Sequence, residues 1–233
     1  MPMGLTRRNF LAMGAAAAAP GGSAAGKPLR GIFPIAQTPF TDGGVLDLDA
    51  LGKQVQFLER CGAHGVVWPQ LASEWETLTE KERIDGAEVI ASAGKGLKLA
   101  VVLGVQSTDA ATAVEYARRA ERLGADAIIS LPPSNEEPRA VVDYYKRVGK
   151  ASTLPLFVQA VGKMSPELLL EMHRSVPTLR YVKDEAGQPL ERIGTLLEGS
   201  QGELKVFSGA HGRTMIEEMR RGFSGSMPAA AYA

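Results

Sequence analysis

The strongest constraint on the fold is a regular alternation of short apolar runs with longer amphipathic segments, which starts near Gly31 and continues to the end of the sequence. Short apolar runs predict strands, and amphipathic segments predict helices. The expected strands cover 31–37, 65–68, 98–105, 127–131, 154–159, 179–183, 204–208 and 223–227. The expected helices start after Asp47 or Asp49 and at Ser165, and cover 79–93, 108–123, 139–150, 189–197 and 211–221.

Strands and helices that repeat about every 25–30 residues indicate βα units. A doubly wound sheet usually has fewer strands and a glycine-rich fingerprint after the first one, but here the first strand runs into Gln37-Thr38-Pro39-Phe40. We therefore predict an α/β fold, a (β/α)8 TIM barrel. The barrel would be truncated after strand 8, without its last helix or a C-terminal helical extension. Either the chain is a fragment, which is the favoured interpretation, or oligomer contacts cover the seam.

Residues 1–26 are interpreted as a twin-arginine export signal, which leaves 27–233 as the barrel domain. Arg7-Arg8 precedes Phe10-Leu11, an alanine-rich run and a stretch of small residues. This order of charge, apolar run and small residues is typical of export signals. The apolar run is too short for a permanent membrane span. The expected location is therefore the periplasm or the cell exterior.

Composition excludes several classes of partner. The 26 basic residues balance 26 acidic ones, so neither a nucleic acid nor an anionic membrane is expected to bind. The single cysteine, Cys61, excludes an internal disulfide. No group of histidines and acids has the spacing of a metal site, so no metal is expected.

Lys183 is the central candidate for chemistry because it stands at the C-terminal end of an expected strand, where barrel enzymes place their active sites. Such a lysine can simply be solvated. Alternatively, desolvation lowers its pKa, and the neutral amine then attacks a carbonyl to form a Schiff base. The order of the surrounding elements favours the second interpretation. The next two residues, Asp184 and Glu185, are expected to be a solvated or helix-capping pair.

Five further polar residues are expected to bind substrate at the same end of the barrel: Ser73, Glu74, Ser134, Gln159 and Ser208. Glu74 either transfers protons or ties its own loop together, and the structural role is favoured. Ser134 is more typical of a turn than of a catalytic residue. Gln159 and Ser208 either face the substrate or fill the top layer of the core.

Several motifs resemble, in order, those of the dihydrodipicolinate synthase/N-acetylneuraminate lyase family of class I aldolases, from about Gly31 to Ala233. They are Thr38-Pro39-Phe40, Glu74 with Leu78-Thr79-Glu80-Lys81-Glu82-Arg83, Tyr181-Val182-Lys183-Asp184, Phe207-Ser208-Gly209 and Gly222-Phe223-Ser224-Gly225-Ser226. The resemblance implies that Lys183 holds a small-molecule 2-oxo acid, usually pyruvate, as a covalent imine, without any other cofactor. It also implies a homo-oligomer.

The sequence departs from the family's pattern in three places. The second loop reads Gln70-Leu71-Ala72-Ser73-Glu74 where the family usually has Gly-Thr-Thr-Gly-Glu, so only Ser73 and backbone N–H groups could bind the carboxylate of the oxo acid there. Ser134 stands in place of the family's proton-relay tyrosine. The fifth strand ends with Gln159-Ala160 where the family usually has Tyr-Asn-Xaa-Pro.

Three functional interpretations remain open. The favoured one, because the lysine is present, is a lyase or aldolase that forms or cleaves a carbon–carbon or carbon–oxygen bond next to a 2-oxo acid held on Lys183. The altered loop and the missing tyrosine support a catalytically inactive barrel that binds a small carboxylate or sugar acid. The end of the sequence after strand 8 supports a non-functional fragment.

Overall fold

The computed structural model describes residues 26–133, 137–209 and 213–229. The predicted export signal lies outside these ranges except for Gly26, and Ser134 lies outside them as well. Within these ranges, no helix is both long enough and apolar enough to cross a membrane.

Eight parallel strands form one sheet in the order β1-β8-β7-β6-β5-β4-β3-β2. They are β1 (Gly31–Ile32), β2 (Gly65–Trp68), β3 (Ala100–Gly104), β4 (Ala127–Ser130), β5 (Leu156–Ala160), β6 (Leu179–Asp184), β7 (Lys205–Ser208) and β8 (Gly225–Ser226). A parallel bridge between Ile35 and Val67 joins the segment after β1 to β2. The sheet thus forms a nearly closed barrel, which confirms the predicted (β/α)8 fold.

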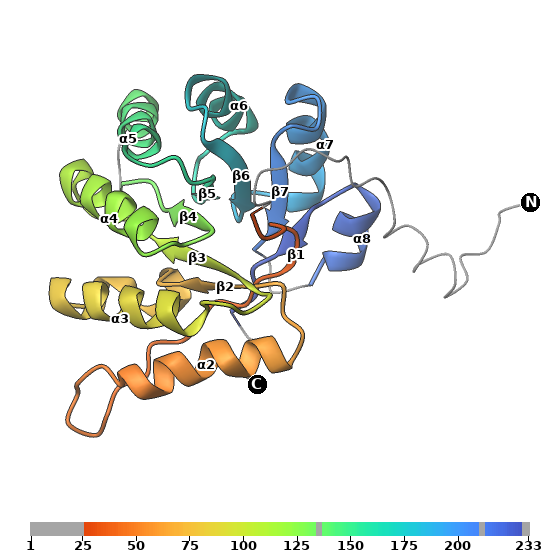
Figure 1. Ribbon diagram of the computed structural model, residues 1–233. Coiled ribbons are helices and arrows are strands. Elements are labelled where there is room, and N and C mark those ends of the chain that lie inside the picture. The colour runs from red at the N-terminus through yellow and green to blue at the C-terminus, as the bar shows by residue number, and fades with distance from the viewer. Residues whose placement is uncertain (1–25, 134–136, 210–212, 230–233) are drawn as a thin grey trace, which may run out of the picture.

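Helices surround the strands as an outer ring (Figure 1). They are α2 (Leu48–Arg60), α3 (Glu80–Ala93), α4 (Ala110–Arg122), α5 (Pro138–Ala151), α6 (Pro166–Ser175), α7 (Pro189–Gly199) and α8 (Met215–Arg220), and two 3-10 helices, η1 (Leu71–Ser73) and η2 (Trp75–Thr77), follow β2. Helix α2 starts after Asp47, whose side chain accepts a hydrogen bond from the Ala50 N–H. Thr79 and Glu82 form a reciprocal capping box at the start of α3. These caps explain why the predicted starts of both helices are correct.

The predicted boundaries differ from the structure mainly at the two ends of the barrel. The expected strand 31–37 is regular only at Gly31–Ile32, because Pro34 has no N–H group to donate to a neighbouring strand. Helix α8 starts at Met215 instead of residue 211, and residues 210–212 lie outside the described ranges.

Alternation along the strands separates two apolar cores. In β3, Val101 and Leu103 belong to a cluster between the sheet and the helices, while Ala100 and Val102 belong to a cluster inside the barrel. The other members of the inner cluster are Phe33, Ile35, Val67, Ala127, Ile129, Phe157, Phe207 and Met227. Successive side chains of a strand point to opposite faces, so the residue number along each strand decides which core a side chain enters.

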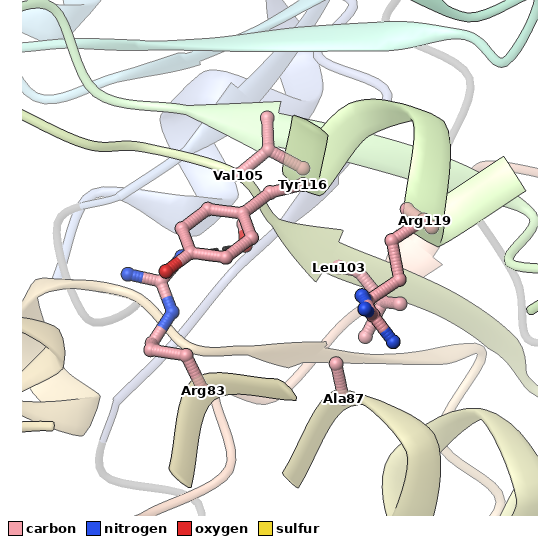
Figure 2. A pocket seen from close by; sticks show the side chains of 8 residues that line it. Arg83, Ala87, Leu103, Val105, Tyr116 and Arg119 are labelled. Atoms are coloured by element: carbon pink, nitrogen blue, oxygen red, sulfur yellow. Dashed lines mark hydrogen bonds between the residues drawn. The ribbon is translucent and has the colours of Figure 1, made fainter. Parts of the chain in front are cut away.

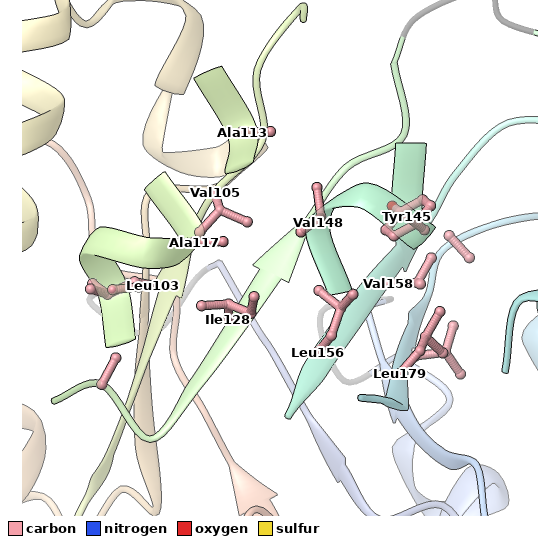
Figure 3. Close-up of a cluster of buried hydrophobic side chains, with 14 of the residues drawn as sticks. Leu103, Val105, Ala113, Ala117, Ile128, Tyr145, Val148, Leu156, Val158 and Leu179 are labelled. Carbon is pink, nitrogen blue, oxygen red and sulfur yellow. The ribbon is translucent and has the colours of Figure 1, made fainter. Parts of the chain in front are cut away.

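Small residues bring α4 close to the sheet. Its buried face consists of Ala113, Ala117 and Ala120, and Figure 3 shows the first two packed near Val105 and Leu103 of the sheet side. The small alanine side chains let the α4 backbone pack close to the sheet. Because alanine loses no side-chain entropy in a helix, this packing has little entropic cost.

Two helical glycines allow a matched test of the packing. A Cβ at Gly86 in α3 would lie 2.2 Å from the ring of buried Trp68, whereas a Cβ at Gly194 in α7 would have no heavy atom within 4 Å. Gly86→Ala should therefore destabilise the fold by about 1–3 kcal/mol through overpacking. Gly194→Ala should stabilise it by about 0.5–1 kcal/mol through helix propensity. Urea denaturation of both variants checks this, and equal effects of the two substitutions would contradict the packing of α3 on Trp68.

Candidate active site

Lys183 lies near the C-terminal end of β6 and points into the barrel. Its neighbours in register are Gln159 on β5 and Phe207 on β7, and Phe207 belongs to the inner cluster. Val182 belongs to the outer cluster, which fixes Lys183 on the inner face. Only 2% of the side chain is exposed, so the simple solvated strand end considered above does not describe this lysine.

Aromatic rings pack together on the inner face of the barrel, directly before Lys183. Tyr181, two residues earlier on the same face, stacks on Phe157 with ring centroids 4.3 Å apart. Phe207 meets Phe157 edge-to-face at 5.2 Å. Such a surrounding solvates an ammonium group poorly, and this burial lowers the pKa of the Lys183 amine below its ordinary value. The nearby carboxylate of Glu185 acts in the opposite direction and raises the pKa.

Glu185 extends over the amine from the end of β6. Its Oε2 lies 3.0 Å from the Lys183 Nζ, and the Gln159 amide donates a short hydrogen bond to the same oxygen. The Gln159 Oε1 is buried and has no hydrogen-bond partner in the described part of the chain. The Glu185 side chain is 23% exposed. A carboxylate thus connects the buried amine with the surface of the barrel end.

Asp184 points the other way, toward the helices. The Arg192 Nε of α7 donates to its Oδ2 at 2.8 Å, and the Arg192 Nη2 donates to the Met164 carbonyl at 2.8 Å. Burial raises the pKa of the Asp184 carboxyl, and the bond from Arg192 lowers it in part. The pair holds the end of β6 against α7 and therefore fixes the backbone that carries Lys183.

The second loop uses its polar groups to hold itself in place. The Ser73 hydroxyl donates to the Ala36 carbonyl at 2.7 Å. Glu74 joins η1 to η2 in the left-handed conformation, with φ of 54°, and its side chain is exposed. The Glu74 carbonyl accepts a bond from the Thr77 hydroxyl at 2.8 Å. Leu71 is 49% exposed, and Ala72 packs against the inner cluster.

A second network of amides lies where β2 and β3 end. The Gln106 Nε2 donates to the Pro69 carbonyl at 2.9 Å, and the Gln70 Nε2 donates to the Gln106 Oε1 at 3.2 Å. Gln70 and Gln106 are buried, and the Gln70 Oε1 has no partner among the described residues. Neither glutamine was expected at the site, because no local motif distinguishes a buried glutamine from a solvated one.

Arg83, a residue of the resemblance motif, is buried on the outer side of the sheet and binds the end of β3. Its guanidinium donates to the Gly104 carbonyl at 3.0 Å and lies 5.6 Å from the Trp75 ring centre and 4.7 Å from that of Tyr116. Burial lowers the pKa of Arg83 to about 10. Figure 2 shows Arg83 and Tyr116 beside a cavity, whose volume is about 10 Å³. That volume holds a single water at most, so this cavity is not the substrate site.

The structure does not bring all predicted residues to the lysine. Of them, Gln159 shares the inner face with Lys183, while Ser73 and Glu74 belong to the second loop. Ser208 is in register with Asp184, so its side chain lies on the outer face. Ser134 falls outside the described residues. The structure adds Glu185, which the sequence alone predicts to be part of a solvated or helix-capping pair. The alternation that puts residue 185 on the face of residue 183 was the available signal.

Metal chemistry has no evident ligand set here. In the ranges that the structure describes, no group of three or more histidines, cysteines and acids could hold a metal ion. The groups gathered at the barrel end, an amine with a carboxylate and an amide beside it, can attack a carbonyl and transfer protons.

Similarity to one protein family covers most of the chain. The sequence profile of the Dihydrodipicolinate synthetase family matches residues 28–232. A 4-hydroxy-tetrahydrodipicolinate synthase from Haloarcula marismortui is 30% identical over 194 residues, which cover 80% of this chain and 62% of that protein. An L-2-keto-3-deoxyarabonate dehydratase from Azospirillum brasilense is 26% identical over 213 residues, or 87% of this chain and 69% of that one.

Solved structures show the same fold. The crystal structure of a candidate dihydrodipicolinate synthetase from Pseudomonas aeruginosa superposes with a TM-score of 0.81 at 26% identity, and the match covers 87% of this chain and 71% of that chain. The present chain spans only 58–62% of the length of two curated synthases that it matches.

The Asp184–Arg192 pair generates a stability prediction with a defined pH dependence. Arg192→Gln leaves a buried carboxylate without its cation and should lower the free energy of unfolding at neutral pH by about 3 kcal/mol. The pKa of Asp184, already raised by burial, should rise further. A carboxyl whose folded pKa lies above its unfolded pKa stabilises the fold at low pH and loses this contribution as pH rises.

The deficit of Arg192→Gln should therefore shrink as the pH falls from about 7 toward about 4. Urea denaturation of wild type and variant across this range measures it. Asp184→Asn combined with Arg192→Gln should recover part of the loss at neutral pH. A deficit that stays the same at every pH would show that the bond to the Met164 carbonyl, and not the ion pair, is what the variant removes.

Proposed function

Because the chain belongs to the dihydrodipicolinate synthetase family, we propose that it is a lyase or aldolase that holds a 2-oxo acid as an imine on Lys183. The reaction forms or breaks a carbon–carbon or carbon–oxygen bond beside the imine carbon. The curated relatives include both a synthase and a dehydratase, so the proposal covers both kinds of bond.

The observation that carries the proposal is the burial of Lys183 at the C-terminal end of β6. An amine must be neutral to attack a carbonyl, and burial among Phe157, Tyr181 and Phe207 favours the neutral form. Burial of a lysine amine away from water is unfavourable, and a role in packing alone does not explain it. Its position at the end of the barrel where active sites lie favours a role in chemistry.

The chemistry needs no metal or organic cofactor in this proposal. Once the imine has formed, its protonated nitrogen withdraws electrons from the neighbouring carbon atoms and stabilises the carbanion that bond cleavage or formation requires. Gln159 shares the inner face with Lys183 and is the predicted substrate-binding residue best placed to contact the bound acid. The roles proposed for Ser73, Glu74, Ser134 and Ser208 rest on the sequence and the resemblance alone.

A barrel that binds a small carboxylate or sugar acid without catalysis is the second candidate. It is favoured by the second loop, where Leu71 and Ala72 provide apolar side chains and the Ser73 hydroxyl is already bonded to the Ala36 carbonyl. In that case Lys183 would act as a buried cation paired with Glu185, and no covalent adduct would form.

Borohydride trapping separates these candidates. The protein is incubated with pyruvate, oxobutyrate, glyoxylate or oxoglutarate, reduced, and examined by mass spectrometry. We expect one acid per chain to be attached as a secondary amine at Lys183, and no adduct in Lys183→Ala. Circular dichroism confirms that both proteins are folded. Absence of any adduct on folded wild-type protein would refute imine chemistry with these acids and favour the binding barrel.

A further inference from the structure

We propose that Glu185 is the group that carries protons to and from Lys183 while the imine forms and breaks. The inference rests on the proposed function, because it assigns a role within that reaction. It is based on the position of the carboxylate, which touches the reacting nitrogen and also reaches the open end of the barrel.

The first observation is that two groups converge on one oxygen. The Oε2 of Glu185 lies 3.0 Å from the Lys183 Nζ and accepts the short bond from the Gln159 amide. The Glu185 N–H also donates to the Ala160 carbonyl at 2.9 Å. The backbone and the side chain are therefore both held by β5, unlike the mobile tip of a surface ion pair.

The second observation is the space that Gly209 leaves for the carboxylate. A Cβ at this position would lie 2.1 Å from the Glu185 Cγ and 2.6 Å from its Oε1. Gly209 has no positive φ that would require a glycine. The Glu185 carboxyl therefore occupies the space that the lack of a side chain at Gly209 leaves beside the end of β7.

The third observation concerns access. The Lys183 side chain is 2% exposed, but that of Glu185 is 23% exposed. Protons released by the buried amine thus have a short path outward through this carboxylate. The Gln159 Oε1, buried and without a partner among the described residues, is an acceptor for a hydroxyl group formed next to Nζ.

The proton balance of imine formation can be written with Glu185 alone. The carboxylate first takes a proton from the Lys183 ammonium. The neutral nitrogen then forms a bond to the carbonyl carbon, the C=O π pair moves to the oxygen, and the carboxyl returns its proton to that oxygen. The carboxylate next removes a second proton from nitrogen and passes it to the hydroxyl group. Water leaves as the C–O bond breaks, and the nitrogen lone pair completes the protonated imine.

A simple ion pair predicts the opposite effect of removing the acid. Glu185 raises the pKa of Lys183, so its loss leaves more neutral amine at neutral pH. If the carboxylate were only an electrostatic partner, Glu185→Gln would form the imine as fast as wild type or faster. If it carries protons, the variant must be slower, because general acid–base catalysis contributes roughly 10²–10⁴-fold to a rate.

The test measures the rate of imine formation in the full chain with pyruvate and the other acids named above. Borohydride is added at timed intervals after mixing. We expect Glu185→Gln to slow trapping by roughly a hundredfold or more and Glu185→Asp to slow it less. Gly209→Ala, which displaces the same carboxylate, should also be slow. Glu198→Gln, which removes an exposed acid from α7, should match wild type.

The outcomes separate this inference from the function on which it rests. If wild type forms no adduct, the imine proposal itself fails. If wild type forms the adduct and folded Glu185→Gln traps it at an equal or higher rate, Glu185 is only a charge partner and the inference is refuted. Should Glu185→Gln fail to fold, trapping at the wild-type rate by folded Gly209→Ala would refute it as well.

Discussion

Closure of the sheet into a barrel is the constraint on which the site depends. Once the eight strands curl around a common interior, alternate side chains must enter either that interior or the layer under the helices. The interior is filled by aromatic and branched side chains up to the level of Phe157, Tyr181 and Phe207. Lys183 is the next inward-pointing residue of β6 beyond this level. Its amine therefore lies above a layer of apolar side chains.

Two opposing influences act on the amine that results. Burial favours the neutral form, which can react, while Glu185 favours the charged form. A lysine with burial alone would be reactive but would have no route for its protons. A lysine with a close carboxylate in water would remain an ordinary ion pair. The combination at the end of β6 gives an amine that is kept from water and still has a proton acceptor at 3.0 Å.

The fold could be predicted from the sequence because its signals are local. The cap at Asp47, the capping box at Thr79 and the helix start at Ser165 each depend on residues within one turn. The strand that carries Lys183 contains Tyr181 and Val182, whose residue types favour strands. The site was less predictable because it depends on neighbours from other strands. Ser208 was expected beside Lys183, but it is in register with Asp184 and lies on the outer face. Glu185 looked like a surface acid because Gln159 and Gly209, which surround its side chain, come from other parts of the sheet. Its alternation with Lys183 was the one signal that the sequence offered.

The fit between Glu185 and Gly209 has a consequence for how such a site can arise by mutation. The carboxylate of residue 185 occupies the space that any Cβ at residue 209 would need, so the two side chains exclude each other in this geometry. An ancestor with a larger residue at 209 could not gain the acid in one step without moving it away from the amine. A substitution that introduces the acid at residue 185 thus gives the present contact with the amine only where residue 209 is a glycine. In the same way, a side chain introduced at residue 209 would move the carboxylate away from its present position beside the amine.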